Sequence, residues 1–186
     1  MKKALPLVFT LFLAFGALAQ EVPGYYDYTH SWKYAMGDDS IFCTEKGTME
    51  FWADGTALDH AQQQRVLVRP DGTWVSWDFD YYSPSLWKVD GNDFYFSGDS
   101  LTFKMTLLSP DFAERNRQSM VTPEWYREYA QKIITSVHRS IGHNTKFNLD
   151  ALTDCLLRWT YTYRDGHTDS WEFYRTNCQQ NTETGR

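Results

Sequence analysis

The chain has 186 residues and carries 24 acidic against 18 basic side chains, a formal net charge of −6 at neutral pH. An acidic protein repels the phosphates of nucleic acids, so a nucleic-acid-binding function is disfavoured. Aromatic residues make up 17% of the chain, which is typical of a β-rich core or of a site that stacks a ligand.

Residues 1–19 have the three parts of a secretory signal peptide. Lys2 and Lys3 form a positive start, a short apolar run covers Leu5–Leu18, and Ala17-Leu18-Ala19 is a small-residue cleavage site. We therefore expect cleavage after Ala19 and export to the periplasm or the cell exterior. No later apolar stretch is long enough to span a bilayer, so no membrane span is expected in the mature chain.

The segments that follow alternate apolar and polar residues with the period of two that marks half-buried strands. Val75, Trp77, Phe79 and Tyr81 share one face of such a segment. Asp-Gly and Gly-Asp pairs between the segments suit the tight turns of antiparallel hairpins. The expected strands span residues 30–36, 47–52, 56–68, 73–82, 85–89, 93–97, 100–108, 155–164 and 168–175.

One segment has a helical pattern instead. Thr122 is a good N-cap and Pro123 suits the first helical position. Apolar residues then recur every four positions as far as Val137, and Gly142 is a natural stop. We expect an amphipathic helix within an insertion over residues 109–144, with Ile133 and Val137 packed against the sheet.

Eight or nine strands must hide their edges, and closure into a β-barrel does this best, with a sandwich as the alternative. The predicted fold is therefore mainly β, an antiparallel up-and-down barrel of about eight or nine strands with one inserted helix. It forms a single domain over residues 20–178, followed by a polar tail over 179–186.

Several hairpin motifs carry a family resemblance. They are Trp32-Lys33, GTMEFWADGTA from Gly47 to Ala57, SLWKVDGNDFYFSGD from Ser85 to Asp99, and the last hairpin from Leu157 to Arg175. This order resembles the lipocalin-like domains of small exported bacterial proteins. The resemblance implies an up-and-down barrel that binds a small molecule, and the inserted helix departs from the simplest pattern of the family.

Aromatic residues on the inward faces are the main candidates for a binding site. A barrel of about eight strands can fill its interior with side chains or hold one small ligand. We expect a non-enzymatic protein that binds a small apolar or amphipathic molecule, and a filled core is the open alternative. The candidate ligand-binding residues are Trp32, Tyr34, Phe51, Trp77, Phe79, Tyr81, Trp159, Tyr161 and Trp171.

Two other functions stay open on the sequence. A protein-interaction module or inhibitor could act through the loops, or through Trp125, Tyr126 and Tyr129 at the start of the helix. A hydrolase could use Asp78 and Asp80, but their strand face also carries Ser76, which favours a solvated face. The histidines lack metal-ligand spacing and no catalytic motif occurs, so no cofactor, metal or catalytic residue is expected.

Three cysteines remain after the predicted cleavage, and an oxidising compartment favours a disulfide. Cys155 shares the parity of the inward residues that follow it, which predicts a free thiol in the core. Cys43 is expected after the first strand and Cys178 after the last, and these strands are neighbours in a closed barrel. The predicted bridge is therefore Cys43–Cys178.

The last hairpin has a predicted register. Its two aromatic sets share a sheet face only if the loop has an odd number of residues. We expect a three-residue loop, Asp165-Gly166-His167, that pairs Tyr161 with Trp171 and Trp159 with Phe173.

Overall fold

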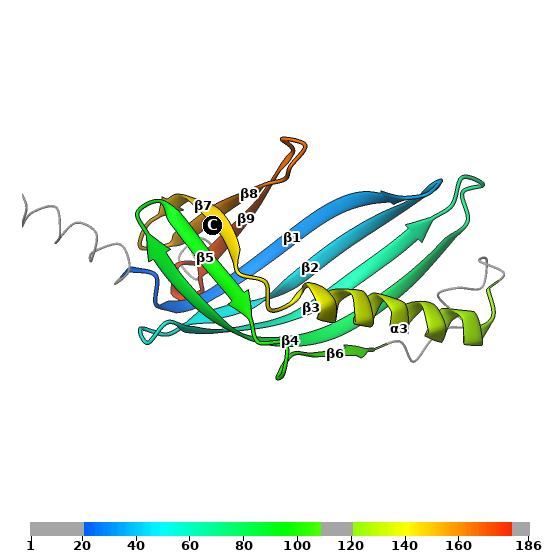
Figure 1. Ribbon diagram of the computed structural model, residues 1–186, viewed down its shortest axis with the longest axis horizontal. Coiled ribbons are helices and arrows are strands. Elements are labelled where there is room, and N and C mark those ends of the chain that lie inside the picture. The colour runs from blue at the N-terminus through cyan, green and yellow to red at the C-terminus, as the bar shows by residue number, and fades with distance from the viewer. Residues whose placement is uncertain (1–20, 109–120, 180–186) are drawn as a thin grey trace, which may run out of the picture.

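The structure, a computed structural model, describes residues 21–108 and 121–179 (Figure 1). The predicted signal peptide, most of the tail and the first part of the insertion lie outside these residues. The elements are β1 (Gly24–Met36), β2 (Asp39–Phe51), β3 (Thr56–Val68), β4 (Trp74–Asp90), β5 (Asp93–Gly98), β6 (Lys104–Leu107), α3 (Pro123–Ser140), β7 (Thr145–Leu152), β8 (Leu156–Thr162), β9 (Thr168–Arg175) and α4 (Thr176–Gln179).

The strands form one closed antiparallel barrel. The hydrogen-bonded order is β3-β2-β1-β9-β8-β7-β5-β4-β6, and β3 also pairs with β4, which closes a ring of eight strands. The ninth strand, β6, pairs only with β4 among the described elements. The predicted antiparallel up-and-down barrel with a helix is confirmed, and the sandwich is excluded.

The barrel is closed at one end and splayed at the other. Strands β1–β4 have 13 to 17 residues, whereas the strands that complete the ring have only 6 to 8. Strand β1 pairs with β9 at only three positions, from Tyr26 to Tyr28. The long strands therefore run past the ring as a four-stranded sheet, and α3 lies along this extension (Figure 1).

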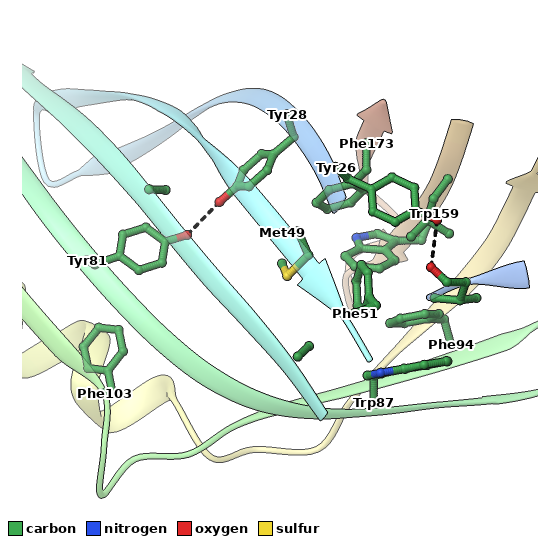
Figure 2. Packing of buried hydrophobic residues seen from close by; sticks show 14 residues of the cluster. Tyr26, Tyr28, Met49, Phe51, Tyr81, Trp87, Phe94, Phe103, Trp159 and Phe173 are labelled. Atoms are coloured by element: carbon green, nitrogen blue, oxygen red, sulfur yellow. Dashed lines mark hydrogen bonds between the residues drawn. The ribbon is translucent and has the colours of Figure 1, made fainter. Parts of the chain in front are cut away.

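Aromatic side chains fill the closed end (Figure 2). Phe51 makes edge contacts with Tyr26, Phe94 and Trp159, with ring centroids 5.8 to 6.2 Å apart. Phe173 packs on the other side of Trp159 at 4.4 Å. These offset and edge-on contacts are the favourable ones for aromatic rings, so this end is a packed core.

Helix α3 begins as the sequence predicts. The Thr122 side chain accepts a hydrogen bond from the backbone N–H of Trp125, and Pro123 stands in the first turn. The helix buries Tyr126, Ala130 and Ile133 against the sheet extension, so the predicted burial of Ile133 is confirmed. Val137 is only partly buried.

Trp77 of β4 fixes the helix to the sheet. Its indole stacks on Tyr126 and Tyr129, with centroids 5.4 and 4.9 Å apart. The indole N–H donates to the Tyr126 carbonyl at 3.2 Å, and the Tyr126 hydroxyl donates to the Ser76 carbonyl at 3.0 Å. The rings at the start of the helix thus pack into the core rather than form a free face.

Several strand predictions differ from the structure. The predicted strands 30–36 and 47–52 are only the ends of β1 and β2, and the predicted strand 100–108 is reduced to β6. Segments 73–82 and 85–89 form one strand, β4, which continues through Pro84. Pro84 lies where the neighbour of β4 changes from β6 to β5, so its missing N–H breaks no ladder. Strand β7 was not predicted, although its pairing with β5 and β8 completes the ring.

The last hairpin has the predicted parity but a different register. Trp159 pairs with Trp171, so the aromatic sets share a face, but the predicted Tyr161–Trp171 and Trp159–Phe173 pairs are both wrong. The backbone N–H of Tyr163 donates to the His167 carbonyl at 2.8 Å, which leaves the three residues 164–166 as the loop. Gly166 takes a φ of +85°, which places the positive-φ residue at the end of this loop.

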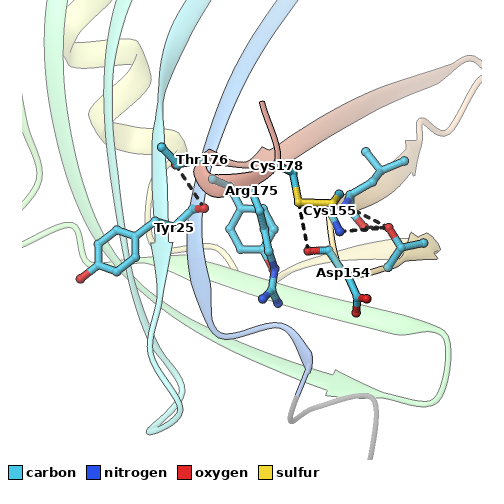
Figure 3. Close-up of a disulfide and its surroundings, with 9 residues drawn as sticks. Tyr25, Asp154, Cys155, Arg175, Thr176 and Cys178 are labelled. Atoms are coloured by element: carbon cyan, nitrogen blue, oxygen red, sulfur yellow. Dashed lines mark hydrogen bonds between the residues drawn. A yellow bond between two sulfur atoms is a disulfide. The ribbon is translucent and has the colours of Figure 1, made fainter. Parts of the chain in front are cut away.

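The predicted Cys43–Cys178 disulfide is wrong. Cys155 and Cys178 form the bridge, with Cα atoms 5.6 Å apart (Figure 3). Cys155 precedes β8 in an exposed turn, in which the Thr153 hydroxyl accepts hydrogen bonds from the backbone N–H groups of Cys155 and Leu156. The alternation of the strand therefore does not extend to Cys155. Cys43 faces inward in the middle of β2 beneath α3, and burial raises the pKa of its thiol to about 11.

Candidate functional site

The structure divides the predicted site residues between three places. Phe51, Tyr81 and Trp159 are buried in the core of the closed end. Trp77 and Phe79 are buried beneath α3. The predicted residues therefore do not line one common space, because the interior is filled both at the closed end and under the helix.

The other four predicted residues lie at the splayed end. Trp32, Tyr161 and Trp171 are partly exposed, and Tyr34 is 38% exposed. Trp32 and Trp171 lie beyond the last β1–β9 pair, Tyr28 with Phe173, where the two strands separate. They therefore lie where β1 and β9 diverge.

We call five contacting side chains at this point the aromatic rim: His30, Trp32, Phe147, Tyr161 and Trp171. His30 stacks between Trp32 and Trp171, with centroids 5.2 and 4.3 Å apart. Its Nε2 atom lies 3.2 Å from the Asp169 carboxylate. Phe147 meets both Trp171 and Tyr161 at 5.7 Å, so the rim is continuous from β1 to β8.

A buried hydrogen-bond donor lies directly beneath the rim. Trp159 pairs with Trp171 across β8 and β9, and its ring contacts Phe147 at 5.3 Å. The residue is 3% exposed, and its indole Nε1 has no hydrogen-bond partner in the described part of the chain. An unsatisfied buried donor costs about 1–3 kcal/mol, which makes this group a candidate for contact with a ligand.

The two other buried indoles show the usual arrangement. Trp77 donates to the Tyr126 carbonyl. Trp87 donates to the carbonyls of Trp52 and Thr56, at 3.1 and 2.8 Å. Trp159 is thus the exception among the three buried tryptophans of the described residues.

A second polar feature crosses the four long strands. Tyr28, Gly47, Ala61 and Tyr81 form one row from β1 to β4, and all face inward. The two small residues in the middle leave room for the tyrosine rings to lean together until their hydroxyls are 3.0 Å apart (Figure 2). A Cβ on Gly47 would lie 2.4 Å from the Cβ of Ala61, so only glycine fits there.

Two carboxyl groups complete what we call the tyrosine–carboxyl cluster: Tyr28, Glu45, Asp59 and Tyr81. Glu45 Oε1 lies 2.8 and 2.7 Å from the Tyr28 and Tyr81 hydroxyls. Asp59 meets the same hydroxyls with one oxygen each, both at 2.8 Å. All four side chains are at most 9% exposed, and each comes from a different long strand.

Burial and the charge of Glu45 raise the pKa of the Asp59 carboxyl to about 8. Burial, together with the two carboxyls, also raises the pKa of the Tyr28 and Tyr81 hydroxyls well above the ordinary value. A guanidinium is linked to the cluster through an amide: Gln63 donates to Glu45 at 2.7 Å, and Arg65 donates to Gln63 at 2.6 Å. Neither carboxyl forms an ion pair within the described residues.

The sequence analysis missed this cluster. Glu45 and Asp59 occupy inward positions of β2 and β3, but on β3 the outward positions include Leu58 and Val66, which are as apolar as the inward ones. The alternation therefore did not tell the two faces apart. One signal could have revealed the carboxyls. Glu45 lies an even number of residues from Met49 and Phe51 on β2, and Asp59 lies an even number from Leu67 on β3, so each shares the inward face of its strand.

The outer surface gives no support to the hydrolase hypothesis. Asp80 lies 3.2 Å from His60, and Asp78 accepts a hydrogen bond from Gln64, both on the outside of the sheet. Two adjoining open grooves of about 610 and 840 Å³ also lie outside, where β9, β1 and β2 meet. They share Asp27 and Thr48, and Tyr25 beside them is 62% exposed.

Within residues 21–108 and 121–179, no helix is long and apolar enough to cross a bilayer. In the same residues no three His, Cys, Asp or Glu side chains come together as a metal site would require. Comparisons with protein-family models and with curated proteins found no match to this chain. The assignment of a site therefore depends on its geometry.

Proposed function

We propose that the protein is an exported, non-enzymatic binding protein of lipocalin-like type that holds a small amphipathic molecule at the aromatic rim. The observation that carries this proposal is the buried indole N–H of Trp159, which lacks a partner directly beneath partly exposed aromatic rings. An apolar body could stack on Trp32 and Trp171, while an acceptor atom meets the Trp159 N–H.

Ligand sites commonly combine apolar and aromatic walls with a few oriented polar groups. The rim supplies such a wall, and the Trp159 N–H and the His30–Asp169 pair supply polar groups beside it. The mouths of β-barrels are common places for these sites. The molecule expected here is small, because the closed end of the barrel is filled by side chains.

Export is supported by two features. The N-terminal segment has the pattern of a signal peptide, and the disulfide between Cys155 and Cys178 is of the kind that persists in oxidising compartments. Protein recovered from the producing cell's exported fraction should begin at Gln20. Recovery of exported protein that retains Met1 would contradict the signal-peptide assignment.

Native mass spectrometry of that protein tests the binding function. A retained small molecule, released by unfolding, is the expected result. The matched variants are Trp159→Phe, which keeps a ring but removes the unpaired N–H, and Trp87→Phe, which removes an N–H that already has partners. Loss of the molecule in the first variant and its retention in the second would support the site.

A second candidate is a protein-interaction module. The specific observation is the pair of grooves outside β9, β1 and β2, flanked by exposed Tyr25. A photo-crosslinking residue in place of Tyr25, in the producing cell, should then give one discrete adduct. An empty result there, together with a retained small molecule, would favour the first function.

A further inference from the structure

The tyrosine–carboxyl cluster lies apart from the aromatic rim, and its hydrogen bonds require a proton count that its tyrosines cannot meet. Five short oxygen–oxygen contacts join its four side chains. A hydrogen bond needs one proton, and the two hydroxyls supply only two. If both carboxyls were ionised, only two protons would be available for the five contacts.

One additional proton on the carboxyl pair reduces this shortage from three contacts without a proton to two. Tyr28 and Tyr81 can then both donate to Glu45 Oε1, while a protonated Asp59 donates to a tyrosine oxygen. No cation in the described residues forms an ion pair with either carboxyl. Arg65 donates to Gln63, and it is Gln63 that donates to Glu45. The charged state of an unpaired buried group is costly, so the proton is the natural compensating charge.

The cluster also ties the long strands together. Each of β1, β2, β3 and β4 contributes one of its side chains, and the row beneath it depends on the close approach of Gly47 and Ala61. These are the strands that extend beyond the ring, where β1 has lost its β9 neighbour. The hydrogen bonds of the cluster therefore join the four long strands near the point where they extend beyond the ring.

We propose that the tyrosine–carboxyl cluster is a proton-dependent latch, which holds β1–β4 together while the Glu45–Asp59 pair retains one proton and loosens them when both carboxyls are ionised. The raised pKa of Asp59 agrees with this arrangement. The device is independent of the ligand site, since it requires only the four cluster residues.

The other groups around the cluster do not replace the proton. Phe103 and Phe173 cover it, at 6.2 Å from Tyr81 and 5.1 Å from Tyr28. The inward titratable or charged groups on the surrounding elements are Tyr26 and His30 on β1, Cys43 on β2, Arg65 on β3, and Asp169 and Arg175 on β9, with His138 of α3 behind Phe103.

Infrared spectroscopy tests the proton directly. The wild-type protein at pH 6 should show the carbonyl stretch of one protonated carboxyl, and this band should disappear by pH 9.5. Asp59→Asn should remove it at pH 6, whereas the control Asp80→Asn, on the outer surface, should keep it. Glu45→Gln should shift the loss of the band to lower pH, because it removes the charge that opposes ionisation of Asp59.

Hydrogen exchange tests the latch. After correction for intrinsic exchange rates, the opening of amides in β1–β4 should increase about tenfold per pH unit between pH 5.5 and 7.5 in the wild type. The Asp59→Asn variant should show no such increase. The proposal is overturned if the wild type lacks the band at pH 6, or if exchange in the wild type is independent of pH. If Asp59→Asn does not fold, the wild-type measurements and Glu45→Gln still decide.

Discussion

Two tryptophan-to-phenylalanine substitutions should differ sharply in their effect on stability. Trp87 and Trp159 are both buried in the same core, and their rings both contact Phe51 and Phe94. Each substitution removes a similar part of an indole, at about 1 kcal/mol for the lost apolar area. Their difference therefore isolates the two N–H groups.

The polar terms have opposite signs. Trp87→Phe removes one donor that makes two hydrogen bonds, which costs about 1–2 kcal/mol in addition to the lost apolar area. The free energy of unfolding should therefore fall by about 2–3 kcal/mol in total. Trp159→Phe removes an unsatisfied donor and recovers about 1–3 kcal/mol, so the free energy of unfolding should stay unchanged or rise slightly. The expected difference between the variants is about 2–5 kcal/mol.

Urea unfolding of ligand-free protein, refolded after denaturation, measures this difference. The slope with urea concentration should be the same for both variants, so that midpoints report stability alone. The reasoning is refuted if Trp159→Phe is destabilised as much as Trp87→Phe. That result would mean the Trp159 N–H already has a partner in the free protein, and the proposed site would lose its main support.

Three further predictions concern the disulfide, the helix and pH. Replacing Cys155 and Cys178 by Ser should lower the free energy of unfolding by about 3 kcal/mol, because the unfolded chain is no longer constrained by a loop of 23-residue separation. Calorimetry with and without reductant measures this loss. An unchanged Tm on reduction would contradict the bridge. Ile133→Ala should lower the free energy of unfolding by about 2–4 kcal/mol, and Val137→Ala should lower it less, because Val137 is only partly buried. Urea unfolding midpoints measure both losses. Equal small losses would mean that α3 is loosely attached. The pKa of Asp59 is higher in the folded protein than its ordinary value, so its contribution is fully present below about pH 4 and is lost as pH rises toward about 8. The slope should be about 1.4 kcal/mol per pH unit, and chemical unfolding at several pH values should show a flat profile for Asp59→Asn.

The strand pattern and the helix could be predicted because each depends on local chemistry. Thr122 and Pro123 mark the start of α3 without reference to the rest of the chain. The alternation around Trp77 likewise reports a face that is buried whatever lies across from it. Both predictions are confirmed because the physical cause of each feature lies within a few residues of it in the sequence.

The disulfide and the polar cluster could not be predicted from local pattern. Pairing of Cys155 with Cys178 depends on the turn before β8, to which the alternation of the strand does not extend, and on α4 at the end of β9. The cluster depends on Gly47 and Ala61, whose small size matters only because Tyr28 and Tyr81 flank them on other strands. Such long-range arrangements appear only when the register of four strands is known.

The buried thiol of Cys43 has a consequence for the order of folding. Strands β1–β4 pair as consecutive hairpins, whose contacts are local in sequence and form early. Cys155 and Cys178 are synthesised after these four strands. A chain that is delivered N-terminus first can therefore enclose its odd cysteine before the other two arrive, and so avoid mispairing without any change in the stability of the final structure.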